Sequence, residues 1–250
     1  MHKVAIGLTT YNDVVYTREA LKSLFYHTAC SDTFEYSFML LDDASQDLDT
    51  STLVDEFEEH QIIYFRNDKN LGLTSLWNKG YQLARDRSCS YYVICNNDVL
   101  FSPNWANNLL GALLENEPFL AAGPLTNAPG HVMLQHIHTV YNHAEMTNKP
   151  EAIRDIANRI SALKAIRWYR LNGFCMAFNM YHLARYEIEH GYPFNSYEQY
   201  KIYGAEDELF RRANSEVLIA LNSYVFHYKQ VTLEKYLTMT TNFMHQRVRV

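Results

Sequence analysis

The feature that most constrains the fold is the order of apolar and polar segments in the first half of the chain. Short apolar runs alternate with longer stretches whose apolar residues recur at the spacing of an amphipathic helix. The runs that we predict as strands are residues 3–9, 36–41, 62–66 and 91–95. The stretches that we predict as helices are residues 13–27, 51–60 and the part of 70–85 that follows its glycine-containing loop. This alternation predicts an α/β fold, a Rossmann-like domain with a central, mostly parallel mixed sheet flanked by helices.

The second half of the chain alternates less regularly. Residues 150–168 carry apolar side chains at helical spacing behind Pro150, which suits the first turn of a helix, so we predict one helix there. The strands that we predict in this half are residues 118–125, 172–180, 217–221 and 224–228, with a loop that enters a helix at 203–213. No glycine- or serine-rich linker divides the halves, which predicts one domain over residues 1–232 and a helical tail at 233–250.

Length, charge and hydrophobicity exclude several classes of protein. The 250 residues are enough for one well-buried domain. Asp and Glu outnumber Lys and Arg by 28 to 22, and the net charge of -6 disfavours a protein that coats nucleic acid. No run approaches the roughly 18 apolar residues of a membrane span, and the first apolar run is too short for a signal peptide. We therefore expect a cytoplasmic protein whose four cysteines are reduced.

Acidic and amide side chains follow the predicted strands of the first half, and ligands of open α/β sheets bind beyond such strand ends. Asn96, Asn97 and Asp98 follow the fourth strand. A carboxylate there can hold a hard divalent cation and the amides can bond a ribose, although an Asx turn is the structural alternative. Asp42 and Asp43 close the second strand, where a carboxylate can bond a nucleobase or ribose, or can form the turn alone.

Two positions in the second half also carry chemistry. Small residues precede an acidic cluster at 206–208, where the acids either cap the predicted helix or provide a general base beside a ligand. His227 lies among apolar and aromatic residues, which is more typical of a core histidine than of a metal ligand. A loose cluster of histidines lacks the spacing of a metal site, and we interpret it as loop: His131, His136, His138 and His143.

Seven segments, taken in order, resemble one enzyme family. They are VAIGLTTYND, MLLDDASQD, FRNDKNLGLTSLWNKGYQLA, YYVICNNDV, LNGFCMAFN, YGAEDELFRRA and YVFHYKQVT, and they run from about Lys3 to about Thr232. Together they resemble the inverting nucleotide-sugar glycosyltransferases of family 2, which have the GT-A fold. The resemblance implies that residues 1–125 bind the nucleotide sugar and that residues 126–232 bind the acceptor.

The resemblance implies a nucleotide-binding role for five residues. Thr9 and Tyr11 match positions that line the nucleoside pocket, and Asp43 matches the residue that contacts the base. Asn96 and Asn97 lie at the family's DxD motif. Asn96 replaces the first acid of that motif, which weakens a two-carboxylate metal site but still allows a hydrogen bond to the ribose.

The resemblance also implies a metal pair and a catalytic pair. Asp98 matches the last acid of the DxD motif, and His227 matches a histidine that completes the metal shell in many members. The implied cofactor is a divalent cation, Mn²⁺ or Mg²⁺, that neutralises the leaving nucleoside diphosphate. Asp207 matches the catalytic base, and Glu206 is placed to orient the acceptor.

The implied donor is a UDP-, GDP- or dTDP-sugar, while the acceptor stays open between a glycan, a lipid-linked sugar and a protein. A non-catalytic protein of the same fold that binds a nucleotide sugar or a glycan is the main alternative, because of Asn96. A nucleotidyltransferase is disfavoured because the first strand lacks a following glycine-rich loop, and the absence of GxGxxG disfavours a Rossmann oxidoreductase. The sequence leaves the oligomeric state open.

Aromatic and basic residues suggest where the acceptor binds. The chain holds 19 tyrosines, and a tyrosine ring offers apolar area with a polar tip. Tyr197, Tyr200 and Tyr203 lead into the acidic cluster, and we expect the acceptor to contact these rings, whereas Tyr11 belongs to the implied nucleoside pocket. The basic residues of the predicted helix and its end form either a solvated face or a peripheral contact with an anionic membrane: Arg154, Arg159, Lys164, Arg167 and Arg170.

Overall fold

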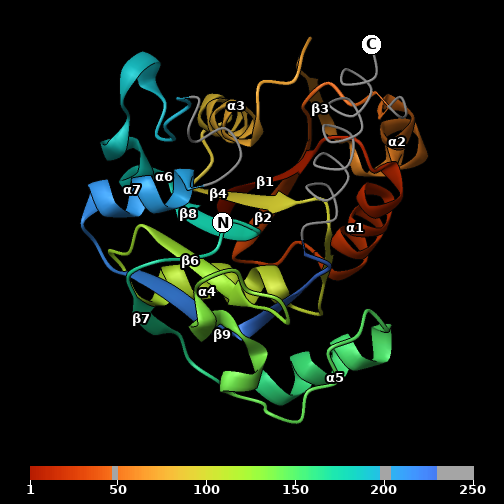
Figure 1. Ribbon diagram of the computed structural model, residues 1–250, viewed down its shortest axis with the longest axis vertical. Helices are drawn as coiled ribbons and strands as arrows, with labels where there is room; N and C mark the ends of the chain where they lie inside the picture. Colours follow the sequence, from red (N-terminus) through yellow and green to blue (C-terminus); the bar gives the residue numbers. More distant parts are fainter. Residues whose placement is uncertain (47–49, 198–203, 230–250) are drawn as a thin grey trace, which may run out of the picture.

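The first half of the chain builds the parallel part of a sheet. The computed structural model describes residues 1–46, 50–197 and 204–229. Its first half contains, in chain order, β1 (His2–Thr10), α1 (Val14–His27), β2 (Phe34–Asp42), α2 (Ser51–Glu56), β3 (Ile63–Arg66), α3 (Leu73–Asp86) and β4 (Tyr91–Asn96). β1 pairs in parallel with β2 and β4, and β2 pairs in parallel with β3. The predicted alternation of strands and helices is confirmed (Figure 1).

The second half extends this sheet with strands of both directions. It contains β5 (Val99–Phe101), α4 (Trp105–Glu115), β6 (Ala121–Leu125), α5 (Pro150–Ile160), β7 (Ile166–Trp168), β8 (Cys175–Asn179), α6 (Met180–Leu183), α7 (Ala205–Ala213) and β9 (Val217–His227). β8 lies antiparallel between β4 and β6, and β9 runs parallel to β6. Over the described residues the strand order is β3-β2-β1-β4-β8-β6-β9-β5, with β7 paired to β9. The sheet is therefore mixed, and β1 to β4 form its first parallel part, in the half of the chain for which nucleotide binding stays a prediction.

The helix predicted over residues 150–168 is too long. α5 ends at Ile160, and β7 forms an exposed edge strand in which Ile166 lies opposite Ile219 of β9. Leu163 packs against the core from the loop between α5 and β7, so the apolar spacing of the helix continues beyond its end. The expected run of basic residues is thus divided between a helix, a loop and a strand.

The two strands predicted at 217–221 and 224–228 are one strand, and β5, like β7, is a short strand that was not predicted. β9 runs without a break from Val217 to His227, although its register with β6 shifts where Leu125 pairs with Tyr224. β5 directly follows Asp98 and pairs antiparallel with the end of β9. This pairing brings Val99 opposite His227 and so places Asp98 beside the last residue of β9.

Apolar side chains fill both faces of the sheet, because neighbouring residues of a strand point to opposite faces. α1, α2 and α4 contribute Leu21, Leu53 and Leu109 to one buried cluster. α3 and α5 contribute Trp77 and Ile156 to the cluster on the other face. Figure 1 shows β4 and β8 between α3 and α4, which is the layered arrangement that these two clusters require.

α3 approaches the sheet closely at one glycine. A Cβ atom on Gly80 would lie 2.0 Å from the Tyr92 hydroxyl and 2.9 Å from Leu41 Cδ1. Tyr92 is fully buried, and its hydroxyl donates a hydrogen bond to the carbonyl of Trp77 at 3.2 Å. The ring of Tyr92 is therefore fixed against the backbone of α3, and this contact requires glycine.

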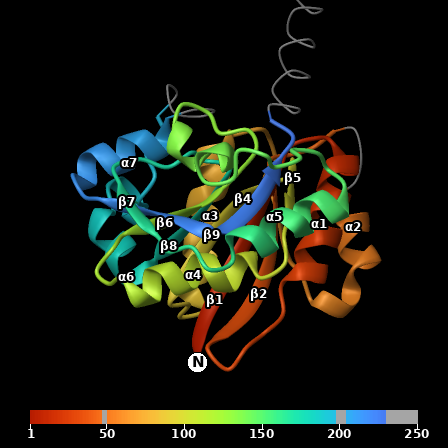
Figure 2. The ribbon, with the colours of Figure 1, turned by 90° about the horizontal axis from the view of Figure 1, so that it is seen from below.

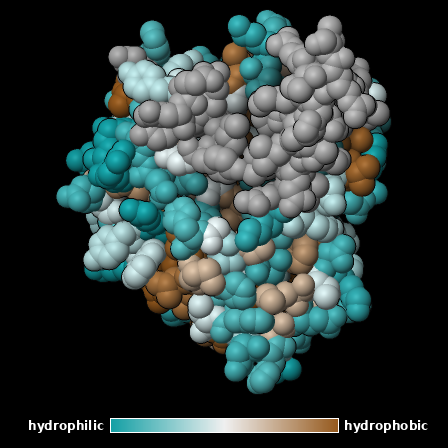
Figure 3. Space-filling model, viewed as in Figure 1, coloured by the Kyte–Doolittle hydropathy of each residue, from teal (hydrophilic) through white to brown (hydrophobic). Residues whose placement is uncertain are grey.

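One end of the sheet collects the strand ends that carry the predicted site. Figure 2 shows β1 rising from the N-terminus, and the last part of β9 running toward the same side of the molecule. The outer face in Figure 3 is mostly hydrophilic, with apolar side chains in small separate patches. Among the described residues no helix is both long and apolar enough to span a membrane. The predicted C-terminal helix at 233–250 and two of the tyrosines, Tyr200 and Tyr203, lie outside the described residues.

Candidate active site

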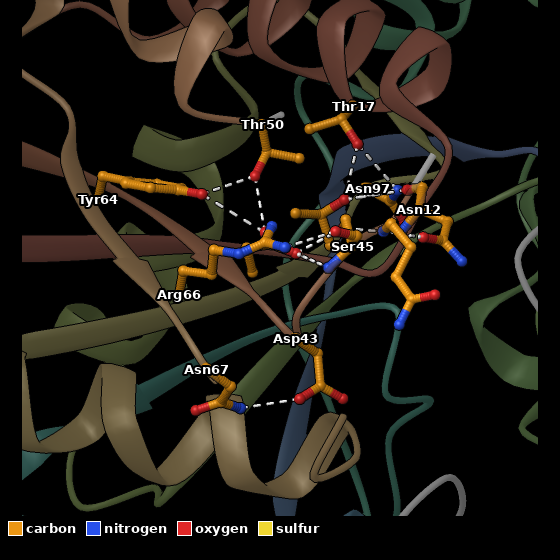
Figure 4. Close-up of polar contacts among 12 residues, drawn as sticks. Asn12, Thr17, Asp43, Ser45, Thr50, Tyr64, Arg66, Asn67 and Asn97 are labelled. Atoms are coloured by element: carbon orange, nitrogen blue, oxygen red, sulfur yellow. Dashed lines mark hydrogen bonds and ion pairs between the residues drawn. The ribbon is translucent and has the colours of Figure 1, made fainter. Parts of the chain in front are cut away.

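Asp42 organises the turn that follows β2. Its fully buried carboxylate accepts hydrogen bonds from the amide and hydroxyl of Ser45, at 3.0 and 2.5 Å, and from the hydroxyl of Thr50 at 2.7 Å. Arg66 at the end of β3 completes the cluster with an ion pair to Asp42 (Figure 4). The carboxylate of Asp42 thus has a structural role, which is the turn-forming alternative for the first acid of the Asp42-Asp43 pair.

Asp43 holds the loop that enters α3. Its buried carboxylate accepts hydrogen bonds from the Asn67 side chain at 2.8 Å and from the amides of Leu71 and Gly72 at 2.8 and 2.7 Å (Figure 4). Gly72 has a φ of 89°, a conformation that favours glycine. Asp43 therefore shapes the rim of the region where a nucleobase was expected, and its direct contact with a base stays a prediction.

The other residues expected at the nucleoside pocket differ in burial and in the hydrogen bonds that their side chains form within the protein. The Thr9 hydroxyl is buried and donates to the carbonyl of Cys95 at 3.2 Å. The Asn97 amide donates to the hydroxyls of Thr10 and Thr17, at 3.2 and 3.0 Å, and so ties the β4–β5 turn to β1 and α1 (Figure 4). Tyr11 is half-buried just beyond β1, so part of its ring can contact a ligand.

Asn96 and Asp98 place two unpartnered oxygens in the turn between β4 and β5. Asn96 ends β4, and its backbone N–H donates a hydrogen bond to the carbonyl of Phe174 at 2.9 Å. Asn96 Oδ1 and Asp98 Oδ1 are both buried, and neither has a hydrogen-bond partner among the described residues. Leaving a buried acceptor unpaired costs about 1–3 kcal/mol, so these two oxygens are the kind of groups that bind a ligand.

His227 directs one ring nitrogen toward Asp98. Its Nε2 atom lies 3.3 Å from Asp98 Oδ1, while its Nδ1 atom lies 3.1 Å from the carbonyl oxygen of Ala128. Because a carbonyl only accepts, the proton of a neutral ring is on Nδ1, and Nε2 carries the lone pair. Asn127 fixes the backbone of His227 from both sides, and the ring of Phe174 stacks on the imidazole at 5.0 Å.

The pair of Asp98 and His227 fits a divalent cation. A carboxylate oxygen and the unprotonated nitrogen of a neutral imidazole are both acceptors, so this contact is stabilised by a positive group: a second ring proton on His227 or a cation bound between the two. Asp98 Oδ1 and His227 Nε2 lie 3.3 Å apart, and no hydrogen bond to Asp98 Oδ1 is formed by the described residues. No cluster of three or more His, Cys, Asp or Glu side chains suited to a metal occurs in the described part of the chain. A cation held here would take its other ligands from a diphosphate and water, as Mg²⁺ commonly does.

Asp207 lies in the first turn of α7, between two basic side chains. α7 begins after Gly204, whose φ of 80° turns the chain into the helix. The two carboxylate oxygens of Asp207 lie 3.4 and 3.3 Å from His131 Nε2, and Oδ1 lies 4.0 Å from Arg170 Nε. About a third of the Asp207 side chain remains exposed, at 32%. An accessible carboxylate at this place can receive a proton from a bound hydroxyl.

Glu206 lies next to Asp207 in a more enclosed environment. Burial raises the pKa of Glu206, and the nearby charge of Asp207 raises it further. A Cβ atom on Gly173 would lie 3.0 Å from Glu206 Oε1, so the side chain packs directly against this glycine. The next acid of the cluster, Glu208, bonds Arg212 at 2.9 Å within α7 and belongs to the helix rather than to the site.

Two short segments connect the pair of Asp98 and His227 to the pair of Glu206 and Asp207. Residues 127–131 contact His227 through Asn127 and Ala128, and contact Asp207 through His131. Residues 173–174 contact Glu206 on one side, and Asn96 and His227 on the other. Neither Asn127 nor His131 was singled out as a site residue from the sequence, because their contacts depend on how a loop without regular structure packs.

Most of the basic residues expected to form one surface are instead paired with acids. Each of four has an acidic partner within 4.0 Å: Arg159 with Asp155, Lys164 with Glu115, Arg167 with Glu216, and Arg170 with Asp207. Tyr197, the one described member of the group that precedes α7, is exposed. A membrane contact of the basic residues stays a prediction.

Comparison with solved structures identifies the architecture. GalNAc-T7 with UDP, GalNAc and Mn²⁺ superposes with a TM-score of 0.65 at 13% identity, over 91% of this chain and 44% of that one. TarS of S. aureus, residues 1–349, gives 0.62 at 13% identity, over 91% and 61%. The mannosyltransferase PcManGT from Pyrobaculum calidifontis, with GDP-Man and Mn²⁺, gives 0.58 at 14% identity, over 90% and 56%. The chain thus spans about half the length of these proteins, and the likeness shows a shared GT-A fold.

The sequence comparison reaches further than the fold. No curated protein matches the chain. The profile described as glycosyl transferase family 2 matches residues 5–181, which is well over half of the sequence and includes β1 to β8 with the Asn96-Asn97-Asp98 turn. The chain therefore belongs to glycosyl transferase family 2.

Proposed function

We propose that this protein is an inverting glycosyltransferase that moves a sugar from a nucleotide-sugar donor to a hydroxyl group of an acceptor. The observation that carries the proposal is the position of two functional pairs at one end of the sheet. Asp98 and His227 form a cation-binding pair, and Asp207 with Glu206 forms an acid pair that residues 127–131 connect to it. Membership of glycosyl transferase family 2 supports this assignment.

Asp98 and His227 would hold the metal. When bound there, Mn²⁺ or Mg²⁺ supplies Lewis-acid chemistry by neutralising the charge that develops on the leaving nucleoside diphosphate. His227 favours Mn²⁺, because imidazole suits the later first-row metals better than it suits Mg²⁺. The hydrogen bond from Nδ1 to the carbonyl of Ala128 keeps the metal-binding nitrogen of His227 unprotonated.

Asp207 acts as the general base of a single displacement. It removes the proton of the acceptor hydroxyl while the oxygen forms a bond to the anomeric carbon of the donor sugar. The bond between that carbon and the phosphate oxygen breaks, and its electron pair leaves with the nucleoside diphosphate. Attack from the face opposite the leaving group inverts the configuration of the anomeric carbon.

Glu206 orients the acceptor. Because burial raises its pKa, its carboxyl group is more readily neutral than that of an exposed glutamate and can donate a hydrogen bond. A donor beside Asp207 can hold the acceptor hydroxyl with its proton directed at the base. The nucleoside and ribose bind against a wall that five residues form or support: Thr9, Tyr11, Asp43, Asn96 and Asn97.

The donor and acceptor classes follow from the site only in outline. A UDP-, GDP- or dTDP-linked hexose is the proposed donor, in keeping with UDP in GalNAc-T7 and GDP-Man in PcManGT. A glycan, lipid-linked or protein acceptor is proposed to approach from the side of Asp207, as in polysaccharide biosynthesis. The proposed location is the cytoplasm, with peripheral membrane contact reserved for a lipid-linked acceptor.

The Asp207→Asn variant tests the proposal directly. We expect the rate of nucleoside diphosphate release from a UDP-, GDP- or dTDP-sugar with Mn²⁺ to fall by about 100-fold or more, because the amide cannot accept the proton. Donor affinity, measured by calorimetry, should change by less than about twofold, because the Asp98–His227 pair is untouched. Asp155→Asn, on the exposed surface of α5, is the matched control. Full activity of Asp207→Asn would refute the base assignment.

The alternative function is binding without catalysis, and Asn96 is the observation that favours it. An amide replaces a carboxylate of the DxD motif, and this lowers the negative charge available to a cation. A pure binding protein would show donor affinity in the presence of Mn²⁺ but no release of nucleoside diphosphate. A single assay of release over the three donor classes therefore separates the two functions.

A further inference from the structure

The segment Asn127–His131, here called the bridging loop, contacts both halves of the proposed site. At its first end, Asn127 accepts a hydrogen bond from the amide of His227 at 2.8 Å and donates one to its carbonyl at 3.0 Å. The carbonyl of Ala128 accepts a hydrogen bond from Nδ1 of the same histidine at 3.1 Å. At its other end, His131 lies against the carboxylate of Asp207. The bridging loop thus contacts both His227 of the cation pair and Asp207, the proposed base.

Buried amide groups fix the end of the bridging loop. A Cβ atom on Gly130 would lie 2.8 Å from Asn172 Oδ1, so the backbone passes directly over this side chain. Gln135 Oε1 accepts hydrogen bonds from the backbone N–H of Asn172 at 2.8 Å and from its side-chain amide at 3.2 Å, and the fully buried Gln135 donates to the carbonyl of Pro124 at 3.0 Å. The backbone beside His131 is therefore fixed by the core, although the imidazole itself is 53% exposed.

The contact of His131 with Asp207 has a defined direction. Nε2 lies almost equally far from the two carboxylate oxygens, at 3.4 Å from Oδ1 and 3.3 Å from Oδ2. An ionised carboxylate only accepts hydrogen bonds, so Nε2 carries a proton. Arg170 is the second basic group at this carboxylate, but its Nε is 4.0 Å away. His131 is thus the nearer of the two basic groups at the Asp207 carboxylate.

We propose that His131 is a positioning residue for the base: its Nε2–H holds the Asp207 carboxylate in the orientation that receives the acceptor proton. The inference rests on the proposed function, because it assigns His131 a role in the same reaction. His131 donates to the carboxylate and takes no part in bond making at the sugar. The bridging loop, through Ala128 and His131, keeps this orientation in register with the cation pair.

Two substitutions of His131 separate positioning from packing. Gln keeps an N–H donor near the position of Nε2, whereas Phe fills a similar volume without a donor. We expect the kcat of nucleoside diphosphate release to fall about tenfold or more in His131→Phe and to change less than about threefold in His131→Gln. KM for the donor should stay within about twofold in both variants, because Asn127 and Ala128, which hold His227, are unchanged. His143→Phe and His143→Gln, at an exposed histidine further along the connection between β6 and α5, are the matched controls.

Equal rates of His131→Phe and wild type would overturn the proposal, as would equal losses in the Phe and Gln variants. The tautomer of His131 provides a second measurement that needs no activity. In ¹⁵N-histidine spectra of the wild type, the signal of His131 is assigned as the one that disappears in His131→Phe. We expect this signal to show a proton on Nε2 in the wild type, and we expect the Nε2–H tautomer to be lost in Asp207→Ala. If the wild type releases no nucleoside diphosphate from any donor, the proposed function fails. An unchanged tautomer in Asp207→Ala would instead exclude the His131 contact itself.

Discussion

At the scale of single residues, the most informative feature is a buried oxygen that faces a second acceptor. Asp98 Oδ1 has no hydrogen-bond donor among the described residues, and Nε2 of a neutral His227 cannot donate, because the ring proton is on Nδ1, where it bonds the carbonyl of Ala128. Such an arrangement lowers the stability of the protein alone and favours whatever positive group can enter. The stability cost and the cation affinity therefore have the same origin.

Asp98→Asn should separate these two effects. The amide can donate a hydrogen bond to His227 Nε2, so we expect the variant in EDTA to be as stable as the wild type or more stable, by about 1 kcal/mol. The same change should remove most of the increase in Tm that Mn²⁺ gives the wild type. Thermal melts with EDTA and with Mn²⁺ measure both. An undiminished response to Mn²⁺ would place the cation elsewhere.

Glu206 makes stability depend on pH in a direction opposite to that of a salt-bridged acid. Because burial raises its pKa, the folded protein binds more protons than the unfolded chain above the ordinary pKa of glutamate, and stability falls as pH rises through this window. We expect Glu206→Gln to raise Tm over wild type at about pH 8 and to change it little at about pH 4. Glu35→Gln, exposed on β2, is the control. A Tm gain that is the same at both pH values would contradict this account.

At the scale of elements, helix packing decides whether replacing a glycine by alanine stabilises or destabilises the protein. Gly80 in α3 and Gly111 in α4 occupy the interiors of two helices, where glycine is less favourable than alanine. A Cβ at Gly80 would enter the ring and hydroxyl of the buried Tyr92. Nothing in the described structure lies within 4 Å of a Cβ at Gly111. The same substitution therefore has opposite expected effects.

Gly80→Ala should lower the free energy of unfolding by about 2–3 kcal/mol, because α3 must move away from the sheet to admit the methyl group. Gly111→Ala should raise the free energy of unfolding by about 0.5–1 kcal/mol through the propensity of the helix alone. Urea denaturation of the two variants checks both signs. If both alanines stabilise, the close approach of α3 at Tyr92 is not present in solution.

The elements that could be predicted from the sequence are those with a local cause. The strands and helices before Asn96 were predicted within a few residues, because each apolar run is bounded by turn-forming residues. The helix that was predicted beyond Ile160 shows the limit, since Leu163 reaches the core from a loop and imitates the periodicity. The contact of His131 with Asp207 could not be predicted, because the two residues are distant in sequence and the loop between β6 and α5 has no periodic pattern.

At the scale of the whole molecule, many acidic side chains lie beside a basic side chain or a histidine. The chain is acidic, yet the two acids of the candidate site, Asp98 and Asp207, each lie against a histidine. Several basic residues of the second half are paired with acids on neighbouring elements. The surface therefore carries little excess positive charge near α5 and β7, and a nucleotide would depend on the site for its recognition.

A panel of UDP, GDP and dTDP with Mn²⁺ should identify the donor class from the intact protein. A nucleotide at about 100 times its Kd stabilises the folded state by about 2.7 kcal/mol, which corresponds to a Tm increase of about 5–10 °C for a chain of this size. We expect one nucleotide to give this shift and the others a smaller one. The Asp98→Asn variant is the control, because it should lose the Mn²⁺-dependent part. No shift with any nucleotide would contradict a nucleotide-sugar donor.

The position of β8 in the sheet has a consequence for how the protein is made. β8 enters between β4 and β6, although both of those strands precede it in the chain. On the ribosome, β4 therefore emerges with a free edge that stays unpaired until residue 179 has been synthesised, and such an edge invites association with other nascent chains. β9, which brings His227 to Asp98, is made later still. A growing chain that ends before residue 227 therefore lacks the contact between Asp98 and His227, whatever part of the sheet has already formed.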